Sequence, residues 1–330
     1  MKFPFIDGQA THPPAQAVVL PTLDRGKQTD PAGYLIDTPL VDAVNVALLL
    51  GQPLLLTGDP GTGKTQLAYR VAWELGLGRP LRFDTKSTSS ARDLFYSYDT
   101  LRRFHAANTN SGSQANRDYM TYNALGQAIL LSREPHQVEH VLTPGFQHPG
   151  KQRRVVLIDE IDKAPRDFPN DLLNEVENMS FRIPELDNSE ISADAALRPI
   201  LILTSNSERN LPDAFLRRCI YYHIPRPSRE RLLAIVRSRM SESPATPRGT
   251  KLHESAVDFF LQVQNLNLRK TPASAELINW LQSLVQWGAA ANQALKECPV
   301  PLRKSLSTLA KTRDDLEELQ RFVENYLEQP

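Results

Sequence analysis

One eight-residue segment constrains the fold of this chain more than any other part of it. A short apolar run, Pro53–Thr57, precedes the segment, and a helical pattern over Thr65–Leu75 follows it. In this context the glycines let backbone N–H groups converge on phosphate oxygens at a helix N-terminus, which predicts a nucleotide-binding loop in an α/β domain. The residues of the segment are Gly58, Asp59, Pro60, Gly61, Thr62, Gly63, Lys64 and Thr65.

The last two residues of this loop have expected roles in holding a triphosphate. The ammonium group of Lys64 would reach the β- and γ-phosphates, and the hydroxyl group of Thr65 would ligate Mg²⁺. A chance glycine-rich turn is the weaker interpretation, because the motif lies between a strand pattern and a helix pattern.

A second motif supplies two adjacent carboxylates. The apolar run Val155–Asp159 is a predicted strand, and Glu160 follows it directly. A Mg²⁺ ion beside a triphosphate needs oxygen ligands, which is the expected role of Asp159. An attacking water needs a base, for which Glu160 is the candidate. The alternative is a strand that ends in a solvated acidic turn.

The pattern of apolar runs predicts how the chain divides. Five short runs alternate with helical patterns, which indicates a parallel sheet flanked by helices. Beyond residue 224 only helical patterns follow. We therefore expect a proline-rich arm over 1–33, an α/β domain over 34–224 with an insertion at about 102–152, and a helical domain over 225–330. The expected strands are Pro53–Thr57, Leu81–Asp84, Val155–Asp159, Pro199–Thr204 and Ile220–Ile224.

Composition narrows the classes of function. The 330 residues include 38 Lys and Arg against 38 Asp and Glu, so there is no general electrostatic reason to expect nucleic-acid binding. No apolar run reaches the roughly 18 residues that a membrane-spanning helix needs, so membrane insertion is not expected. The N-terminus lacks the pattern of a secretory signal, which favours the cytoplasm. Cys219 and Cys298 lie too far apart to indicate a disulfide framework or a cysteine-rich zinc site.

Taken together, the segments GDPGTGKT, VVLIDE, LTSN and LPDAFLRRC resemble AAA+ ATPases, and within them the MoxR-like group. The resemblance runs from about Tyr34 into the C-terminal helices and is strongest in Ile158–Glu185 and Arg198–Cys219. It implies a P-loop NTPase fold with a three-layer α/β/α domain, a parallel five-stranded sheet of order 5-1-4-3-2 and a smaller all-helical lid. It also implies ATP and Mg²⁺ as cofactors and ATP hydrolysis as the reaction.

The resemblance assigns further residues. Asn206 matches sensor 1, which positions the attacking water, although an asparagine here also suits the cap of a turn. Arg218 matches the arginine finger that reaches the γ-phosphate of a neighbouring subunit, and the adjacent Arg217 is a second candidate. Ordinary ion-paired surface arginines are the alternative for both.

One position departs from the family pattern. Many members carry the sensor 2 arginine just after a proline that starts a lid helix, but Pro272 is followed here by Ala273. The nearest cations are Lys270 and Arg269. Either would serve as a substitute contact to the nucleotide, and ordinary surface charge is an equally good interpretation.

The resemblance also covers two inserted segments. Ala91–Asp99 and Tyr122–Leu130 are similar to the two ends of the helix 2 insert, which often faces the central channel of a ring. Met179–Glu185 is similar to the hairpin inserted before sensor 1. Three aromatic residues of the first segment are candidates for the channel, or for the more common core positions: Phe95, Tyr96 and Tyr98.

The run His136–His140 matches the HxxEH pattern of a group of zinc peptidases. That chemistry needs a firm helix and a distant third ligand, whereas Pro135 begins a very short segment within a polar loop. We expect solvated histidines here.

The resemblance implies an ATPase that acts as a homo-oligomeric ring, expected to be a hexamer, and that remodels or activates a client protein. A von Willebrand A domain protein is an expected partner in trans. The alternative is a nucleotide-gated scaffold in a multi-protein signalling or defence system. A nucleic-acid motor is less favoured, because the net charge is zero.

Overall fold

The computed structural model describes most of the chain as two compact units. The first is the α/β unit, formed by Ile36–Asp59 and Gly63–Pro225, and the second is the helical unit, formed by Met1–Leu35, Pro60–Thr62 and Arg226–Pro330. Most of the expected arm over 1–33 lies outside the described residues. These are 3–6, 8, 12, 16–20, 30–109, 115–206, 211–240 and 250–328.

A parallel sheet forms the centre of the α/β unit. Its order is β2-β5-β8-β1-β9, which is the predicted 5-1-4-3-2 order when these five strands are numbered along the chain and the sheet is followed from its other edge. Its interior strands are apolar and buried on both faces, whereas the edge strands β2 and β9 alternate between more and less exposed residues. The strands are β1 Leu54–Thr57, β2 Leu81–Asp84, β5 Val155–Asp159, β8 Ile200–Thr204 and β9 Ile220–His223.

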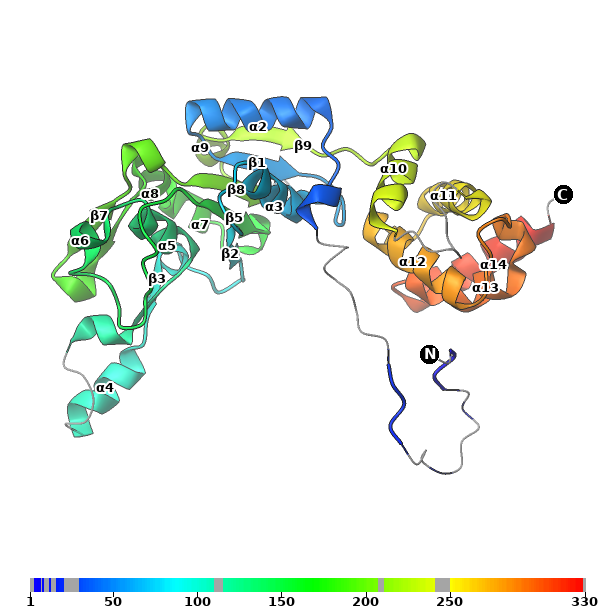
Figure 1. Ribbon diagram of the computed structural model, residues 1–330, viewed down its shortest axis with the longest axis horizontal. Coiled ribbons are helices and arrows are strands. Elements are labelled where there is room, and N and C mark those ends of the chain that lie inside the picture. Colours follow the sequence, from blue (N-terminus) through cyan, green and yellow to red (C-terminus); the bar gives the residue numbers. More distant parts are fainter. Residues whose placement is uncertain are drawn as a thin grey trace. The chain divides into compact units, whose positions relative to one another are not determined.

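Several helices pack on this sheet, and short connections join consecutive helices and strands. In Figure 1, α2 lies along β1 and β9, and it ends where Gly51 adopts a left-handed conformation with φ 61°. Helix α3 packs on β5 and β8, and α5 packs on β2 and β5. The α-helices of this unit are α2 Thr38–Leu50, α3 Lys64–Glu74, α4 Thr100–Thr109, α5 Ala124–Leu131, α6 Pro135–Val138, α7 Phe168–Asp171, α8 Leu173–Asn178 and α9 Asp213–Leu216.

The segment expected as an insertion at about 102–152 has a different organisation. It begins earlier, in a hairpin of β3 Tyr96–Tyr98 and β4 Met120–Tyr122 that carries α4. Helix α5 is no part of a surface insert, because residues such as Leu125 and Ile129 are fully buried against the central sheet. A second hairpin pairs β6 Ser180–Ile183 with β7 Ser189–Ser192, where the resemblance placed one.

The helical unit has a separate apolar core around Trp280, whose Nε1 donates a 2.9 Å hydrogen bond to Ser305 Oγ. The last helix is capped at its N-terminus, since Asp315 N donates to Thr312 Oγ1 at 3.1 Å. Its α-helices are α10 Arg229–Arg239, α11 Lys251–Gln264, α12 Ser274–Gln286, α13 Pro299–Ser305 and α14 Arg313–Glu328. The 3-10 helices of the chain are Pro31–Gly33, Ala91–Leu94, Asn116–Tyr119, Ile161–Lys163, Pro184–Leu186, Ala195–Leu197, Leu295–Glu297 and Leu306–Thr308.

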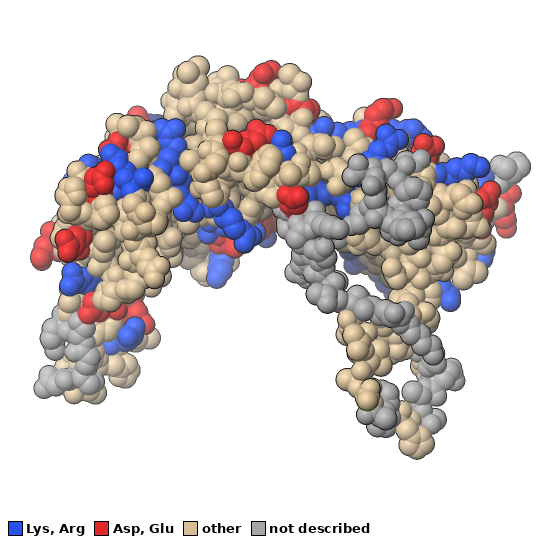
Figure 2. All heavy atoms as spheres, in the orientation of Figure 1, with Lys and Arg blue, Asp and Glu red and all other residues tan. Residues whose placement is uncertain are grey.

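Two properties of the described residues bear on the classes considered above. None of their helices combines the length and the apolar character that crossing a bilayer requires. On the face displayed in Figure 2, basic and acidic side chains are mixed.

Candidate active site

The loop between β1 and α3 has the backbone of a phosphate-binding turn. Three of its glycines have positive φ: 140° at Gly58, 77° at Gly61 and 93° at Gly63. Side chains disfavour this region, so these positions require glycine for the loop to fold back over the start of α3. Lys64 and Thr65 are the first residues of that helix, as the motif predicts.

The ammonium group of Lys64 is held at the base of the loop. Its Nζ donates to the carbonyl oxygens of Gly58 at 2.7 Å and Asp59 at 3.0 Å, and to Oδ1 of Asn206 at 3.0 Å. Burial lowers the pKa of Lys64, and the nearby carboxylate of Asp162 opposes that shift. The sheet thus brings the predicted sensor 1 asparagine into direct contact with the loop lysine.

The carboxylate of Asp159 lies at the centre of the site and is only 5% exposed. Its Oδ1 accepts hydrogen bonds from Thr65 Oγ1 at 3.0 Å and from Thr204 Oγ1 at 2.6 Å. On the other oxygen, Oδ2 lies 2.9 Å from a guanidinium nitrogen of Arg82. Asp159 and Thr65 were predicted together, whereas Thr204 and Arg82 were missed.

The Asp159 and Thr65 oxygens fit a Mg²⁺ site. Both are hard oxygen donors, and adjacent ligands of an octahedral Mg²⁺ lie about 3 Å apart, which is close to the separation found here. Lys64 begins the same helix and would face the phosphates that complete such a site.

Glu160 leaves the strand in a left-handed conformation, with φ 56°. Its backbone N–H donates to Thr204 Oγ1 at 2.9 Å, and its side-chain Oε2 accepts a hydrogen bond from Lys163 Nζ. A non-glycine residue in this region costs of order 1–2 kcal/mol, which the contact with Thr204 helps to offset. Lys163 is three residues further along the short helix after β5, a spacing that would have identified it as the partner.

Asn206 also contacts the segment after β5. Its backbone N–H donates to Asp162 Oδ1 at 3.2 Å, while its side chain accepts from Lys64. The turn that the capping alternative requires continues into 207–210, which lie outside the described residues.

The two candidate finger residues lie on the surface after α9. Arg218 is 45% exposed, and it donates from Nε to Glu177 Oε2 at 3.2 Å and from its NH1 nitrogen to the Ala214 carbonyl at 2.9 Å. Arg217 is exposed at the C-terminal end of the same helix. These contacts of Arg218 do not involve the residues around Lys64.

In the helical unit, the two cations near the sensor 2 position differ. Arg269 forms an ion pair with Asp314 at 2.6 Å, and its backbone N–H donates to Asp315 Oδ1 at 2.7 Å. Lys270 is exposed. Arg269 therefore has an exposed ion-pair partner in its own unit, and both cations stay candidates for the predicted nucleotide contact.

The histidines of the HxxEH pattern, His136 and His140, are both exposed. The helix that contains the first of them, α6, has four residues. Among the residues that the structure describes, no group of three or more His, Cys, Asp or Glu side chains is placed to hold a metal ion.

The hypothesis that Phe95 and Tyr96 face a channel is wrong for this chain. Both are buried, and their rings lie 5.1 Å and 6.3 Å from that of Phe181, so they form part of the core beneath the β6–β7 hairpin. Among the described residues of the insert, Leu101 and Phe104 on α4 are the large apolar side chains that are exposed.

The sequence is similar to one family of known proteins. The sequence model of the "ATPase family associated with various cellular activities (AAA)" matches residues 54–226. No curated protein matched the chain. Among solved structures, a variant of RuvB from Thermotoga maritima is similar with a TM-score of 0.46 and 16% identity, over 88% of this chain and 76% of that one.

Proposed function

Because this chain belongs to the AAA family of ATPases, we propose that it binds ATP with Mg²⁺ and hydrolyses it. One observation carries the proposal: Thr204 connects the two carboxylate residues of the site, since its hydroxyl donates to Asp159 and accepts from the Glu160 backbone. The loop threonine Thr65 binds the same Asp159, so loop and strand end form one hydrogen-bonded unit.

Each residue has a separate part in the reaction. Mg²⁺, when bound, would neutralise phosphate charge, and Asp159 and Thr65 are the residues that would hold it. Lys64 would place a positive charge on the β- and γ-phosphates in a site where burial strengthens the attraction. Asn206 would orient the attacking water, and the Glu160 carboxylate would take its proton.

Lys163 bears on when Glu160 can act. The ammonium group of Lys163 occupies Oε2 of Glu160, so this oxygen is not free to accept a proton from water while the contact is made. Glu160 would therefore exchange Lys163 for the attacking water when the substrate binds. Lys163 is exposed, so this exchange needs no rearrangement of the core.

The exposed Arg218 supports a site completed by a second copy of the chain. An arginine offers fixed, always-charged donors to the charge that builds up on a transferred phosphoryl group. We propose that Arg218 serves a neighbouring site in a cytoplasmic ring, a hexamer in the MoxR-like manner, with Arg217 as a secondary contact and Lys270 in place of sensor 2. The ring would remodel a client protein, together with a von Willebrand A domain partner.

The proposal is tested by two variants of the same site. We expect Lys64→Ala to lose ATP binding, because the phosphates lose their cationic partner, and Glu160→Gln to retain binding but not hydrolysis. Binding is measured by calorimetry and turnover by phosphate release. Equal loss of binding in both variants would contradict the role of Glu160.

Turnover in the presence of other proteins separates the remodelling role from that of a nucleotide-gated scaffold. A remodelling enzyme is expected to hydrolyse ATP faster when its client is present. A scaffold would turn over slowly at a rate that added proteins leave unchanged.

A further inference from the structure

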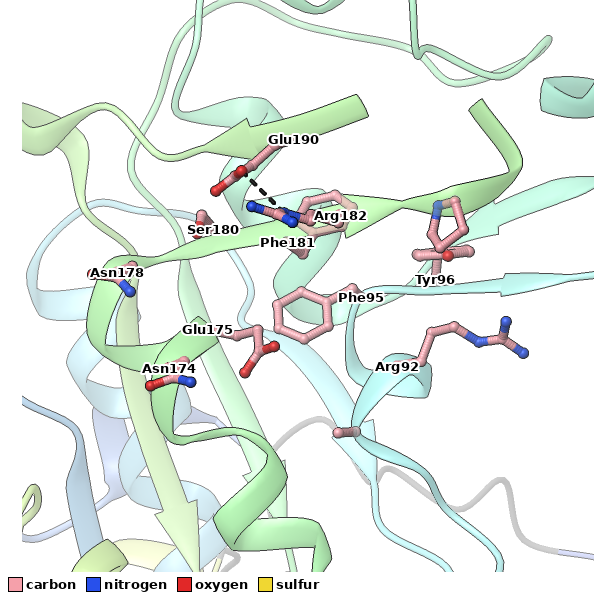
Figure 3. Close-up of a pocket in the computed structure, with 12 residues that line it drawn as sticks. Arg92, Phe95, Tyr96, Asn174, Glu175, Asn178, Ser180, Phe181, Arg182 and Glu190 are labelled. Atoms are coloured by element: carbon pink, nitrogen blue, oxygen red, sulfur yellow. Dashed lines mark hydrogen bonds and ion pairs between the residues drawn. The ribbon is translucent and has the colours of Figure 1, made fainter. Parts of the chain in front are cut away.

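A pocket of about 500 Å³ opens in the α/β unit, between the base of the β3–β4 hairpin, helix α8 and the β6–β7 hairpin. Figure 3 shows the lining side chains on these elements, with Phe95 and Glu175 near the centre and the guanidinium group of Arg92 turned away from them to the right. None of its lining residues belongs to the proposed nucleotide site. The ATPase reaction therefore gives this pocket no role.

One wall of the pocket is aromatic and firmly held. The rings of Phe95 and Phe181 stack with their centroids 5.1 Å apart. Beside them, the Tyr96 hydroxyl donates a 2.8 Å hydrogen bond to Glu185, and burial together with this bond raises the pKa of Tyr96. The small parts of these two rings that line the pocket are apolar, which suits the aliphatic stem of a long side chain.

The charged side chains around the pocket are unequally partnered. Arg182 donates to Glu190 at 3.1 Å, and Arg92 donates to Glu185 at 3.2 Å. The carboxylate of Glu175 points toward the ring of Phe95 in Figure 3, and its Oε2 is buried with no hydrogen-bond partner. A carboxylate oxygen in this state carries a desolvation cost that a cationic donor would relieve.

We propose that this pocket binds the side chain of a lysine or arginine carried by an extended polypeptide segment. The stem would lie against the parts of Phe95 and Phe181 that line the pocket, and the cationic head would pair with Glu175. The arginines at the rim already have acidic partners, so the unmatched charge that faces a ligand is negative.

The strands beside the pocket favour a polypeptide as the carrier of that side chain. Tyr96 belongs to β3 and Phe181 to β6, and each of these strands lies in a two-stranded sheet within the described part of the chain. Each therefore has one edge without a strand neighbour, where an extended segment can add main-chain hydrogen bonds. The inference rests on the proposed function only in taking this segment as part of the client.

The test uses short fluorescent alanine peptides with a central arginine, citrulline or glutamate, and fluorescence anisotropy with the full chain and no nucleotide. Citrulline keeps the shape of arginine but has no charge. We expect the arginine peptide to bind and the citrulline peptide to bind about ten- to a hundredfold more weakly. Equal binding of these two peptides, or tighter binding of the glutamate peptide, would overturn the proposal.

Two variants locate the binding. Glu175→Gln should weaken binding of the arginine peptide by the same factor. Glu139 is an exposed glutamate outside the pocket, so Glu139→Gln should leave this binding unchanged. Ala91→Phe should block the peptide by filling the pocket without altering its charge. Unchanged binding in Glu175→Gln and Ala91→Phe, with melting temperatures like that of the parent, would show that the peptide binds elsewhere.

A last comparison tests whether the ligand is a polypeptide or a small guanidinium compound. It also tests the pocket proposal independently of the proposed ATPase function. N-acetylarginine amide should bind more weakly than the peptide, because it adds no strand, and equal affinity would refute the polypeptide. Peptide binding by a chain without ATP hydrolysis would reject the proposed function alone. Hydrolysis without peptide binding would reject the pocket alone.

Discussion

Arg218 Nε donates a 3.2 Å hydrogen bond to Oε2 of Glu177, so the guanidinium proposed to act on a neighbouring nucleotide already has an anionic partner within its own chain. Both side chains are about half exposed, so the pair is weak and easily exchanged. In the proposed role, Arg218 would rest against Glu177 until a phosphate group displaces this partner.

Removing the carboxylate of Glu177 should make it easier for Arg218 to bind a phosphate group. We expect Glu177→Gln to raise ATP turnover by up to about fivefold, since an exposed ion pair contributes about 0.2–1 kcal/mol. The melting temperature should change little. Steady-state turnover at saturating ATP measures the effect, with Glu139→Gln as the control on an exposed glutamate elsewhere. Slower turnover would show that Glu177 assists the finger rather than competing for it.

The action of Arg218 across an interface can be tested with mixed oligomers. We expect Arg218→Ala to bind ATP almost normally and to hydrolyse it of order 10³ more slowly. Mixing it with Lys64→Ala, under conditions of subunit exchange, should restore turnover, because an intact Arg218 then lies beside an intact loop. Mass spectrometry confirms the mixed assemblies. Mixed assemblies without restored turnover would refute a role in trans.

Thr204 offers a test of the link between the two carboxylate residues. The replacement Thr204→Val keeps the shape but leaves the Glu160 N–H without a partner and removes one of the two hydroxyl groups that donate to Asp159 Oδ1. We expect it to lower the free energy of unfolding by about 1–3 kcal/mol and turnover by at least about tenfold. Thr204→Ser retains the hydroxyl and should retain most of the free energy of unfolding and most of the turnover. Chemical denaturation and phosphate release are the measurements.

A buried histidine should make the stability of the helical unit depend on pH. Both ring nitrogens of His253 are buried without a hydrogen-bond partner, and burial together with the charge of Arg237 lowers its pKa. The unfolded chain then binds a proton more readily than the folded one. The free energy of unfolding should be highest above about pH 6.5 and fall below it, by at most about 1.4 kcal/mol per pH unit.

Thermal melting of the parent chain and of His253→Leu between pH 5 and pH 8 measures this dependence. His253→Leu should lose the part of the pH dependence that His253 causes. The control His105→Gln, at an exposed position, should keep it. The same slope in the parent and in His253→Leu would assign the pH dependence to other groups.

The sequence was sufficient for the strands of the central sheet and for the places of the two motifs, one between β1 and α3 and one at the end of β5. Strand β5 has the predicted bounds, because an apolar run between turn residues marks a buried parallel strand clearly, and the edge strand β2 also has the predicted bounds. Helix α4 was missed because its polar composition has no buried face, and β3 and β4 because three residues are too few for a visible alternation.

The missed site residues have a different cause. Arg82 and Thr204 act on Asp159 from the two strands that flank β5, so their roles depend on which strands are neighbours. A local pattern contains no such information. Phe95 and Tyr96 show the same limit, since an aromatic cluster has the same sequence pattern in a core and at a channel.

The hydroxyl groups around Asp159 also donate their hydrogen bonds in a fixed direction. A hydroxyl has a single proton, and Thr65 and Thr204 both direct theirs at this carboxylate. The lone pairs of the Thr65 oxygen are therefore turned away from Asp159, where they can bind a cation. The lone pairs of the Thr204 oxygen accept the hydrogen bond from the Glu160 backbone N–H. Asp159 thus sets the orientation of the oxygen atoms around it before any substrate arrives, so this part of the site needs little reorganisation when substrate binds.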